Sequence, residues 1–161
     1  MNRPGIPVAA LAVVAGGVAA ALHIGKLPPA VPALQASLGI GLVQAGFLLS
    51  LVQVAGMTLG LLVGLAADTI GLRRSMLAGL VLVSLTSALG GGVGVWIDDP
   101  VIAVGWLLAL RGLEGVGFLL AVMPGPGLIR AVAPAGADKA AIGLWGAYTV
   151  SYTHLTLPTK A

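Results

Sequence analysis

The sequence predicts an all-α membrane protein, for three reasons. Apolar residues make up 58% of the 161-residue chain. Charged residues make up only 8%, whereas a water-soluble domain contains about 25% and needs them to cover its surface. The charges are also separated by apolar stretches long enough to cross a bilayer, which takes about 20 residues. The composition therefore excludes a disordered chain and argues against a water-soluble enzyme.

The first stretch without a formal charge covers residues 4–25, and we expect a membrane-spanning helix near 6–25. Arg3, the apolar stretch and the small residues at 19–21 would also suit a cleaved signal peptide. A retained helix is the better interpretation, because a second charge-poor span follows at once and the charges alternate between successive connections.

The next charge-free stretch, residues 27–67, is too long for one span. It contains Pro28, Pro29 and Pro32, and proline lacks an N–H and restricts the residue before it. We therefore expect a loop over 27–40 and a second span over 41–67. The same reasoning predicts spans near 74–96 and 101–129.

A fifth helix is expected over 138–150, but this length covers only about 18 Å of a hydrocarbon core about 30 Å thick. The polar, β-prone residues 151–161 (SYTHLTLPTKA) do not fit a lipid-facing helix. The DNA obtained by back-translating these residues resembles a transposase-derived sequencing adapter. We expect 151–161 to be a non-native tail that takes no part in the fold. The alternative is a natural, divergent tail.

Basic residues are unevenly divided between the two sides of the predicted bundle. One side carries Lys26 and the acidic pair Asp98 and Asp99, and the other carries five basic residues: Arg3, Arg73, Arg74, Arg130 and Lys139. Because Lys and Arg concentrate on the cytoplasmic side, we expect a cytoplasmic N-terminus. We therefore expect a multi-pass protein of a cell membrane, specifically of a bacterial inner membrane.

Several function classes find no support in the sequence. There is no cysteine for a disulfide, a thiolate or a Cys-based metal site. No basic run interleaved with aromatics favours nucleic acid, and no glycine-rich phosphate loop favours a nucleotide. Without a cluster of catalytic side chains, we expect no enzyme, no metal and no cofactor. The glycines are expected to pack helices, on one face of the second span (Gly56, Gly60, Gly64) and of the fourth (Gly117, Ala121, Gly125).

Two charges fall near the middle of the fourth span. Arg111 lies about ten residues, or 15 Å, into it, and Glu114 follows three residues later on the same face. Charges at this depth are costly and mark functional candidates. The pair is either an anion- or proton-handling site or a structural ion pair that stabilises helix packing.

Other polar residues are weaker candidates for a binding site. His23 and Lys26 share a face at the end of the first span, where they can meet an anionic substrate or lie at the membrane interface with the lysine extended to water. Gln53 on the second span can donate to a substrate or to a neighbouring helix.

The connection after the second span combines an acid, a turn glycine and paired arginines. Gly71 permits a tight turn, and Arg73 and Arg74 can bind a carboxylate or lipid headgroups or merely fix orientation. The segment from Gly64 through Asp68 to Arg74 reads GLAADTIGLRR.

This segment resembles the signature loop G-x-x-x-D-[RK]-x-G-[RK]-[RK] between helices two and three of the major facilitator superfamily. Residues 111–117 (RGLEGVG), with Gly115, resemble that family's fourth-helix motif R-x-x-x-G-x-G. Thr69 and Leu72 depart from the loop pattern, where basic residues are usual. The departures put the full gating charge network in doubt but not the family.

The resemblance implies a twelve-helix secondary transporter, of which this chain is the N-terminal part with about five helices. The implied partners are the lipid bilayer, a small-molecule substrate and the missing C-terminal half. Asp68 would contact that half with Arg73 as a network partner, and Arg111 would lie in the central cavity and affect substrate or proton coupling. Since the site of such transporters lies between two halves, the short chain is not expected to transport alone.

Residues 143–148 (GLWGAY) resemble the cyanate/nitroimidazole-permease-like branch, which implies small or anionic substrates. Two alternatives stay open: a proton-coupled multidrug exporter, and a small membrane scaffold protein that does not transport.

Overall fold

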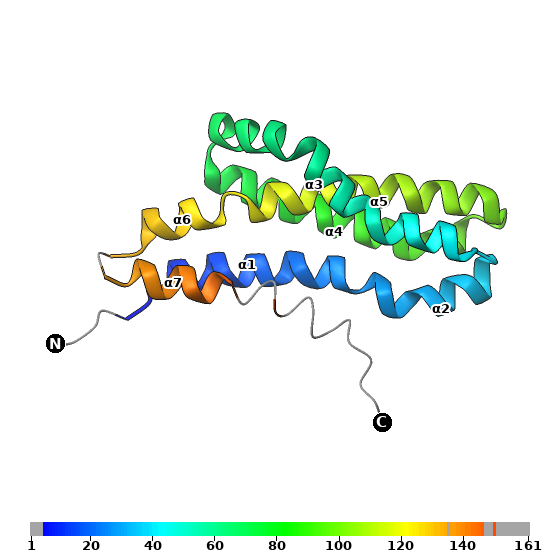
Figure 1. Ribbon diagram of the computed structural model, residues 1–161, viewed down its shortest axis with the longest axis horizontal. Coiled ribbons are helices and arrows are strands. Elements are labelled where there is room, and N and C mark those ends of the chain that lie inside the picture. Colours follow the sequence, from blue (N-terminus) through cyan, green and yellow to red (C-terminus); the bar gives the residue numbers. More distant parts are fainter. Residues whose placement is uncertain (1–4, 135, 147–149, 151–161) are drawn as a thin grey trace, which may run out of the picture.

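The computed structural model describes residues 5–134, 136–146 and 150, and within these every regular element is a helix. The helices form an elongated bundle (Figure 1). Their bounds are α1 (Val8–Gly25), α2 (Leu27–Leu38), α3 (Leu42–Ile70), α4 (Leu72–Trp96), α5 (Pro100–Val122), α6 (Gly125–Val132) and α7 (Asp138–Trp145). The predicted all-α class is confirmed.

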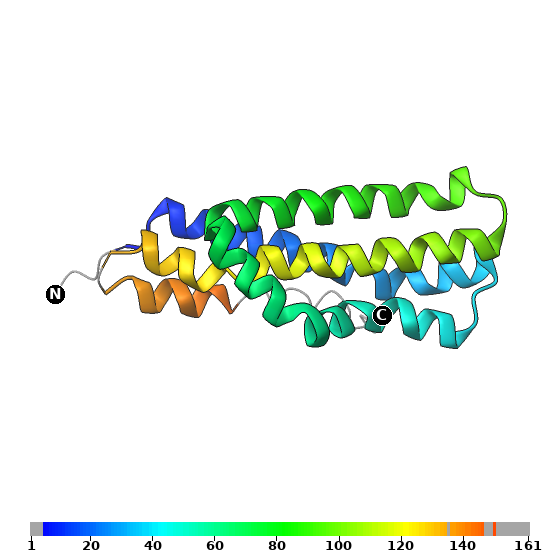
Figure 2. The same cartoon turned by 90° about the horizontal axis from the view of Figure 1, so that it is seen from above.

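Four helical rods are long and apolar enough to cross a membrane: Val8–Leu38, Leu42–Ile70, Leu72–Trp96 and Pro100–Val132. They run up and down, so that their connections gather at two ends (Figure 2). We call these the Gly71 end, with the α3–α4 turn and the α6–α7 connection, and the Asp98 end, with the α2–α3 and α4–α5 connections. Gly71 has φ +95°, a conformation that favours glycine, which confirms its predicted role in a tight turn.

The loop expected over 27–40 is wrong, because most of it forms α2 (Leu27–Leu38). Pro28 lies in the first turn of α2, where a helix needs no N–H of its own. Only Pro32 lies deeper inside the helix. Of the twelve described residues of α2, none is buried, so the helix lies against the bundle without entering its core.

The helix expected over 101–129 is interrupted by a turn at Met123 and Pro124. In an α-helix each carbonyl accepts from the N–H four residues later; for Leu120 that residue is Pro124, which has none. The Oγ of buried Ser75 donates to the Leu120 carbonyl instead, at 3.1 Å. A side chain of α4 thus donates the hydrogen bond that the carbonyl next to the α5–α6 interruption lacks from its own helix.

The closest helix contact joins α4 and α5. A Cβ built on Gly79 would lie 2.3 Å from the Ala121 nitrogen and 2.5 Å from the Gly117 oxygen, so the two backbones touch. This confirms the packing role predicted for the small residues of the fourth span. The groove predicted on the second span is not packed in this way: Gly60 has no heavy atom of the described residues within 4 Å, and Gly56 and Gly64 meet only side-chain tips.

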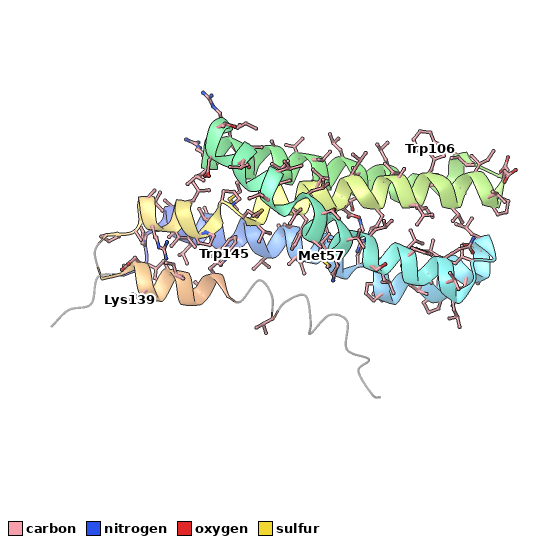
Figure 3. The ribbon with its side chains drawn as sticks, turned by 45° about the horizontal axis from the view of Figure 1, so that its top comes forward. Met57, Trp106, Lys139 and Trp145 are labelled. Carbon is pink, nitrogen blue, oxygen red and sulfur yellow. The ribbon has the colours of Figure 1, made fainter. Side chains whose placement is uncertain are left out.

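The main apolar core lies toward the Gly71 end. The ring of Trp145 on α7 (labelled in Figure 3) packs on Gly17 of α1 and Gly125 of α6, where a built Cβ would lie 2.6 and 2.3 Å from it. The other buried members of this core are Ala10, Val14, Ala20, Met76, Ala121, Val122, Ile129 and Ala141. The buried apolar clusters toward the Asp98 end are smaller.

Candidate functional site

The predicted pair of charges in the middle of α5 is formed and buried. Arg111 is 4% exposed and Glu114 5%. Arg111 Nη1 donates to Glu114 Oε2 at 2.7 Å. Because an isolated buried charge is costly, this mutual pairing is what allows both side chains to stay at this depth.

Arg111 also ties α5 to two other helices. Its Nε donates to the Leu48 carbonyl of α3 at 3.1 Å, and its Nη2 donates to the Ile24 carbonyl of α1 at 3.2 Å. All three guanidinium nitrogens therefore donate to protein groups.

Lys26 joins the pair from the α1–α2 junction. Its Nζ lies 3.0 Å from Glu114 Oε1, and its side chain is 42% exposed. Oε1 has no aligned hydrogen bond from any described residue, so this contact is an ion pair. We call Lys26, Arg111 and Glu114 the charged cluster.

Ser87 of α4 connects Lys26 with His23. Lys26 Nζ donates to Ser87 Oγ, and His23 Nδ1 lies 2.9 Å from the same oxygen. His23 and Lys26 thus share a face as predicted, and that face is turned toward the interior of the bundle and its charged cluster.

A cavity of about 600 Å³ lies beside the charged cluster and toward the Asp98 end. Gly90, Gly91 and Gly94 leave part of its α4 wall without side chains. Leucines of α2, α3 and α5 supply most of its apolar lining, and its polar lining consists of Lys26, Ser37, Thr86, Ser87, Asp98, Arg111 and Glu114.

The charges at the inner end of the cavity do not cancel. Two cations, Lys26 and Arg111, meet one carboxylate, Glu114, which leaves one positive charge within the cluster. Asp98 also lines the cavity but forms no ion pair with another described residue. Lys26 is the more exposed of the two cations, so it is the better placed to meet a solute. In the part of the chain that the structure describes, no group of three or more His, Asp or Glu residues could hold a metal ion.

Three of the predicted cavity residues, His23, Gln53 and Gly115, do not line it. His23 instead contacts the lining residue Ser87. Gln53 is exposed on α3. Gly115 faces α3, where a built Cβ would lie 3.0 Å from the Ala55 Cβ and 3.2 Å from the Val52 Cα, so its contact is helix packing.

The loop motif lies at the opposite end of the bundle from the cavity. Asp68, Arg73 and Arg74 are exposed there, and none of them forms an ion pair with another described residue. Gly64 precedes them on α3, and a Cβ built on it would meet the Met123 Cε at 3.4 Å. The motif and the charged cluster are therefore two separate sites.

Sequence reasoning missed Ser87 as a site residue and read Asp98 only as a marker of orientation. A signal for the first is present: Ser84, Thr86 and Ser87 put three hydroxyls into four residues of an apolar span. Thr86 uses its hydroxyl on the Leu82 carbonyl of its own helix, at 2.8 Å. Ser87 is left as the α4 hydroxyl that contacts the cluster.

The family model described as Major Facilitator Superfamily matches residues 9–151 of the chain. No curated protein and no solved structure matches it significantly. Residues 147–149, in the run that resembles the permease-like branch, and the expected tail at 151–161 lie outside the described residues. The match covers both motifs and all the described helices except Val8, the first residue of α1. The chain thus belongs to the major facilitator superfamily, a family of membrane transporters rather than enzymes, and is a multi-pass membrane protein with the N-terminal helices of that fold.

Proposed function

We propose that this protein takes part in secondary active transport of a small solute by alternating access, and that the cavity beside the charged cluster is the solute site. The family implies transport across a membrane. The observation that carries the location is a cavity whose inner end holds one uncompensated positive charge. Intramembrane charges of this kind are typical of substrate and ion pathways.

The solute we propose is a small anion, organic or inorganic. Lys26 is partly exposed to the cavity, and Ser87 adds a hydroxyl beside it. A monoanion bound at Lys26 would neutralise the remaining charge of the cluster, which lowers the cost of holding it away from water. The permease-like branch suggested by residues 143–148 favours the same class of substrate.

We propose further that the N-terminus is cytoplasmic, in a cell membrane of the bacterial inner-membrane kind, so that the Asp98 end faces outward. Asp68 and Arg73 stay exposed at the Gly71 end, which leaves them for contact with a second half of the transporter. Because the solute path of such transporters lies between two halves, the 161-residue chain should bind a solute weakly and should not transport it alone.

The test uses proteoliposomes that contain either the 161-residue chain or the product of the complete gene. Accumulation of labelled benzoate, but not of benzylamine, by the longer product supports anion transport. Accumulation of benzylamine alone would favour the proton-coupled exporter, in which Glu114 would carry the proton. Transport by the short chain would refute the need for a second half. Stable expression of the short chain from a gene with a natural stop, and no longer transport-competent product, would favour the scaffold protein.

We propose that residues 151–161 are a non-native tail. Independent genomic reads that continue through codon 151 into the same codons would show that the tail is natural.

A further inference from the structure

The carbonyl of Ile24 occupies an unusual position at the α1–α2 junction. In an α-helix it would accept from the N–H of residue 28, but residue 28 is a proline and has none. In a bilayer, a backbone carbonyl without a donor is costly. The Ile24 carbonyl therefore needs a hydrogen-bond donor from another part of the protein.

Arg111 supplies that donor, because its Nη2 donates to the Ile24 carbonyl at 3.2 Å. The same arrangement recurs at the other proline break, where Ser75 Oγ donates to Leu120, four residues before Pro124. In both places a buried side chain of a neighbouring helix serves the carbonyl that a proline leaves without its helical donor.

This use of Arg111 changes which cation is available to a solute. Each guanidinium nitrogen of Arg111 already donates to a protein group, and the residue is 4% exposed. Lys26, two residues after Ile24, lines the cavity with a side chain that is 42% exposed. Its partner oxygen, Glu114 Oε1, lacks an aligned hydrogen bond from the described residues, so this contact is the easiest one in the cluster to exchange.

We propose that Lys26 is the anion-binding group of the cavity and that Arg111 is a positioning residue, which holds the α1–α2 junction so that Lys26 reaches Glu114 and the cavity. The inference rests on the proposed transport of an anion. An entering anion competes with Glu114 Oε1 for the lysine ammonium, while the bonds of Arg111 to Ile24, Leu48 and Glu114 stay in place.

The first experiment measures binding of 4-fluorobenzoate by ¹⁹F NMR to the 161-residue chain in phosphatidylcholine nanodiscs. Lys26→Gln should weaken binding about tenfold or more, because it removes a charge-assisted hydrogen bond. Lys26→Arg keeps the charge and should bind within about threefold of the wild type. Lys139→Gln, at an exposed lysine of the Gly71 end, is the matched control and should bind normally. The neutral analogue 4-fluorobenzyl alcohol should not distinguish these chains.

The second experiment separates positioning from direct contact by Arg111. Arg111→Lys keeps a cation for Glu114 but loses the planar fork that reaches both carbonyls, and should weaken binding by about fivefold and lower the melting temperature. Adding Pro28→Ala restores an N–H that can serve Ile24, and should recover most of both losses. Adding Pro29→Ala instead should recover neither, because its helical acceptor would be Gly25, which Arg111 does not contact.

The outcomes separate the two proposals. If neither the wild-type 161-residue chain nor the product of the complete gene binds 4-fluorobenzoate, the anionic substrate is wrong and this inference fails with it. If it binds and Lys26→Gln binds equally well, only the role of Lys26 is wrong. If Pro28→Ala and Pro29→Ala have the same effect beside Arg111→Lys, the positioning role of Arg111 is refuted. Recovery by Pro28→Ala alone, with loss in Lys26→Gln, supports the inference in full.

Discussion

The two ends of the bundle use the same residue type in the same helix for opposite purposes. Near the Gly71 end of α4, Gly79 lets the backbone of α5 approach so closely that a built Cβ would lie 2.3 Å from a backbone nitrogen. Near the Asp98 end, Gly90, Gly91 and Gly94 have no heavy atom of the described residues within 4 Å of a built Cβ, and they line the cavity. Gly79 brings two helices together, whereas Gly90, Gly91 and Gly94 leave part of the cavity wall without side chains.

The difference teaches that a glycine-rich membrane helix need not pack along its whole length. Helix association in lipid depends on close contact through small residues, and that contact is concentrated where α5 offers Gly117 and Ala121. Where α5 instead offers Leu107, Leu110, Arg111 and Glu114, the helices enclose a cavity. What lies across from a glycine therefore decides its role.

The largest expected effect is toward the Asp98 end, where Glu114 pairs with both Lys26 and Arg111. Glu114→Leu leaves buried Arg111 without its carboxylate, and breaking a buried ion pair in this way costs about 3–5 kcal/mol. The measurement is the free energy of unfolding in mixed micelles titrated with SDS. Asp98→Leu, an exposed acid of the same cavity, is the control and should change stability by about 0.5 kcal/mol or less. Similar values for the two variants would show that the charged cluster does not stabilise this end.

The second prediction compares the glycines directly. Gly79→Ala forces a methyl group against the backbone of α5 and should cost about 1–3 kcal/mol, as overpacking does. Gly90→Ala places the methyl group in open space and should stabilise the helix by about 0.5–1 kcal/mol, the usual gain over glycine. The same SDS titration measures both. Equal losses of unfolding free energy in the two variants would show that α4 is packed equally closely at both positions.

The third and smallest effect concerns how α5 begins at the Asp98 end. Asp99 Oδ1 accepts from the backbone nitrogens of Val101 at 2.8 Å and Ile102 at 3.2 Å. Asp99→Ala removes this cap and should cost about 1 kcal/mol. Asp98→Ala, one residue away, removes no such cap and is the matched control. If the two alanine variants lower the melting temperature equally, the cap contributes nothing at this end.

The four spans could be predicted from the sequence, since each apolar stretch long enough to cross a bilayer carries few charges or none. What could not be predicted is how proline acts within them. Pro28 and Pro29 were expected to stop a helix, yet α2 continues through them, because their missing N–H groups fall in its first turn. Pro124 was expected to lie inside a helix, yet it ends α5.

The candidate site was predictable only where its residues are close in sequence. The pairing of Arg111 with Glu114 follows from their spacing along one helix face. The contacts of Arg111 with backbone carbonyls and of Lys26 with Glu114 join residues far apart in sequence, and no side-chain pattern marks a carbonyl that needs a donor. Gln53 shows that a polar residue in an apolar span need not belong to the site, because it is exposed and does not line the cavity.

The two proline breaks differ in when their donors become available during synthesis. Ser75 precedes Leu120 in the chain, so the donor is already made when that carbonyl appears. Ile24 must wait for Arg111, which is 87 residues further on, and at about 5–20 residues per second this takes on the order of ten seconds. The first helix to be made is thus completed only when α5 arrives. A chain that stops before Arg111 would leave the Ile24 carbonyl without a donor. An incomplete bundle would differ from a finished one by this unsatisfied carbonyl.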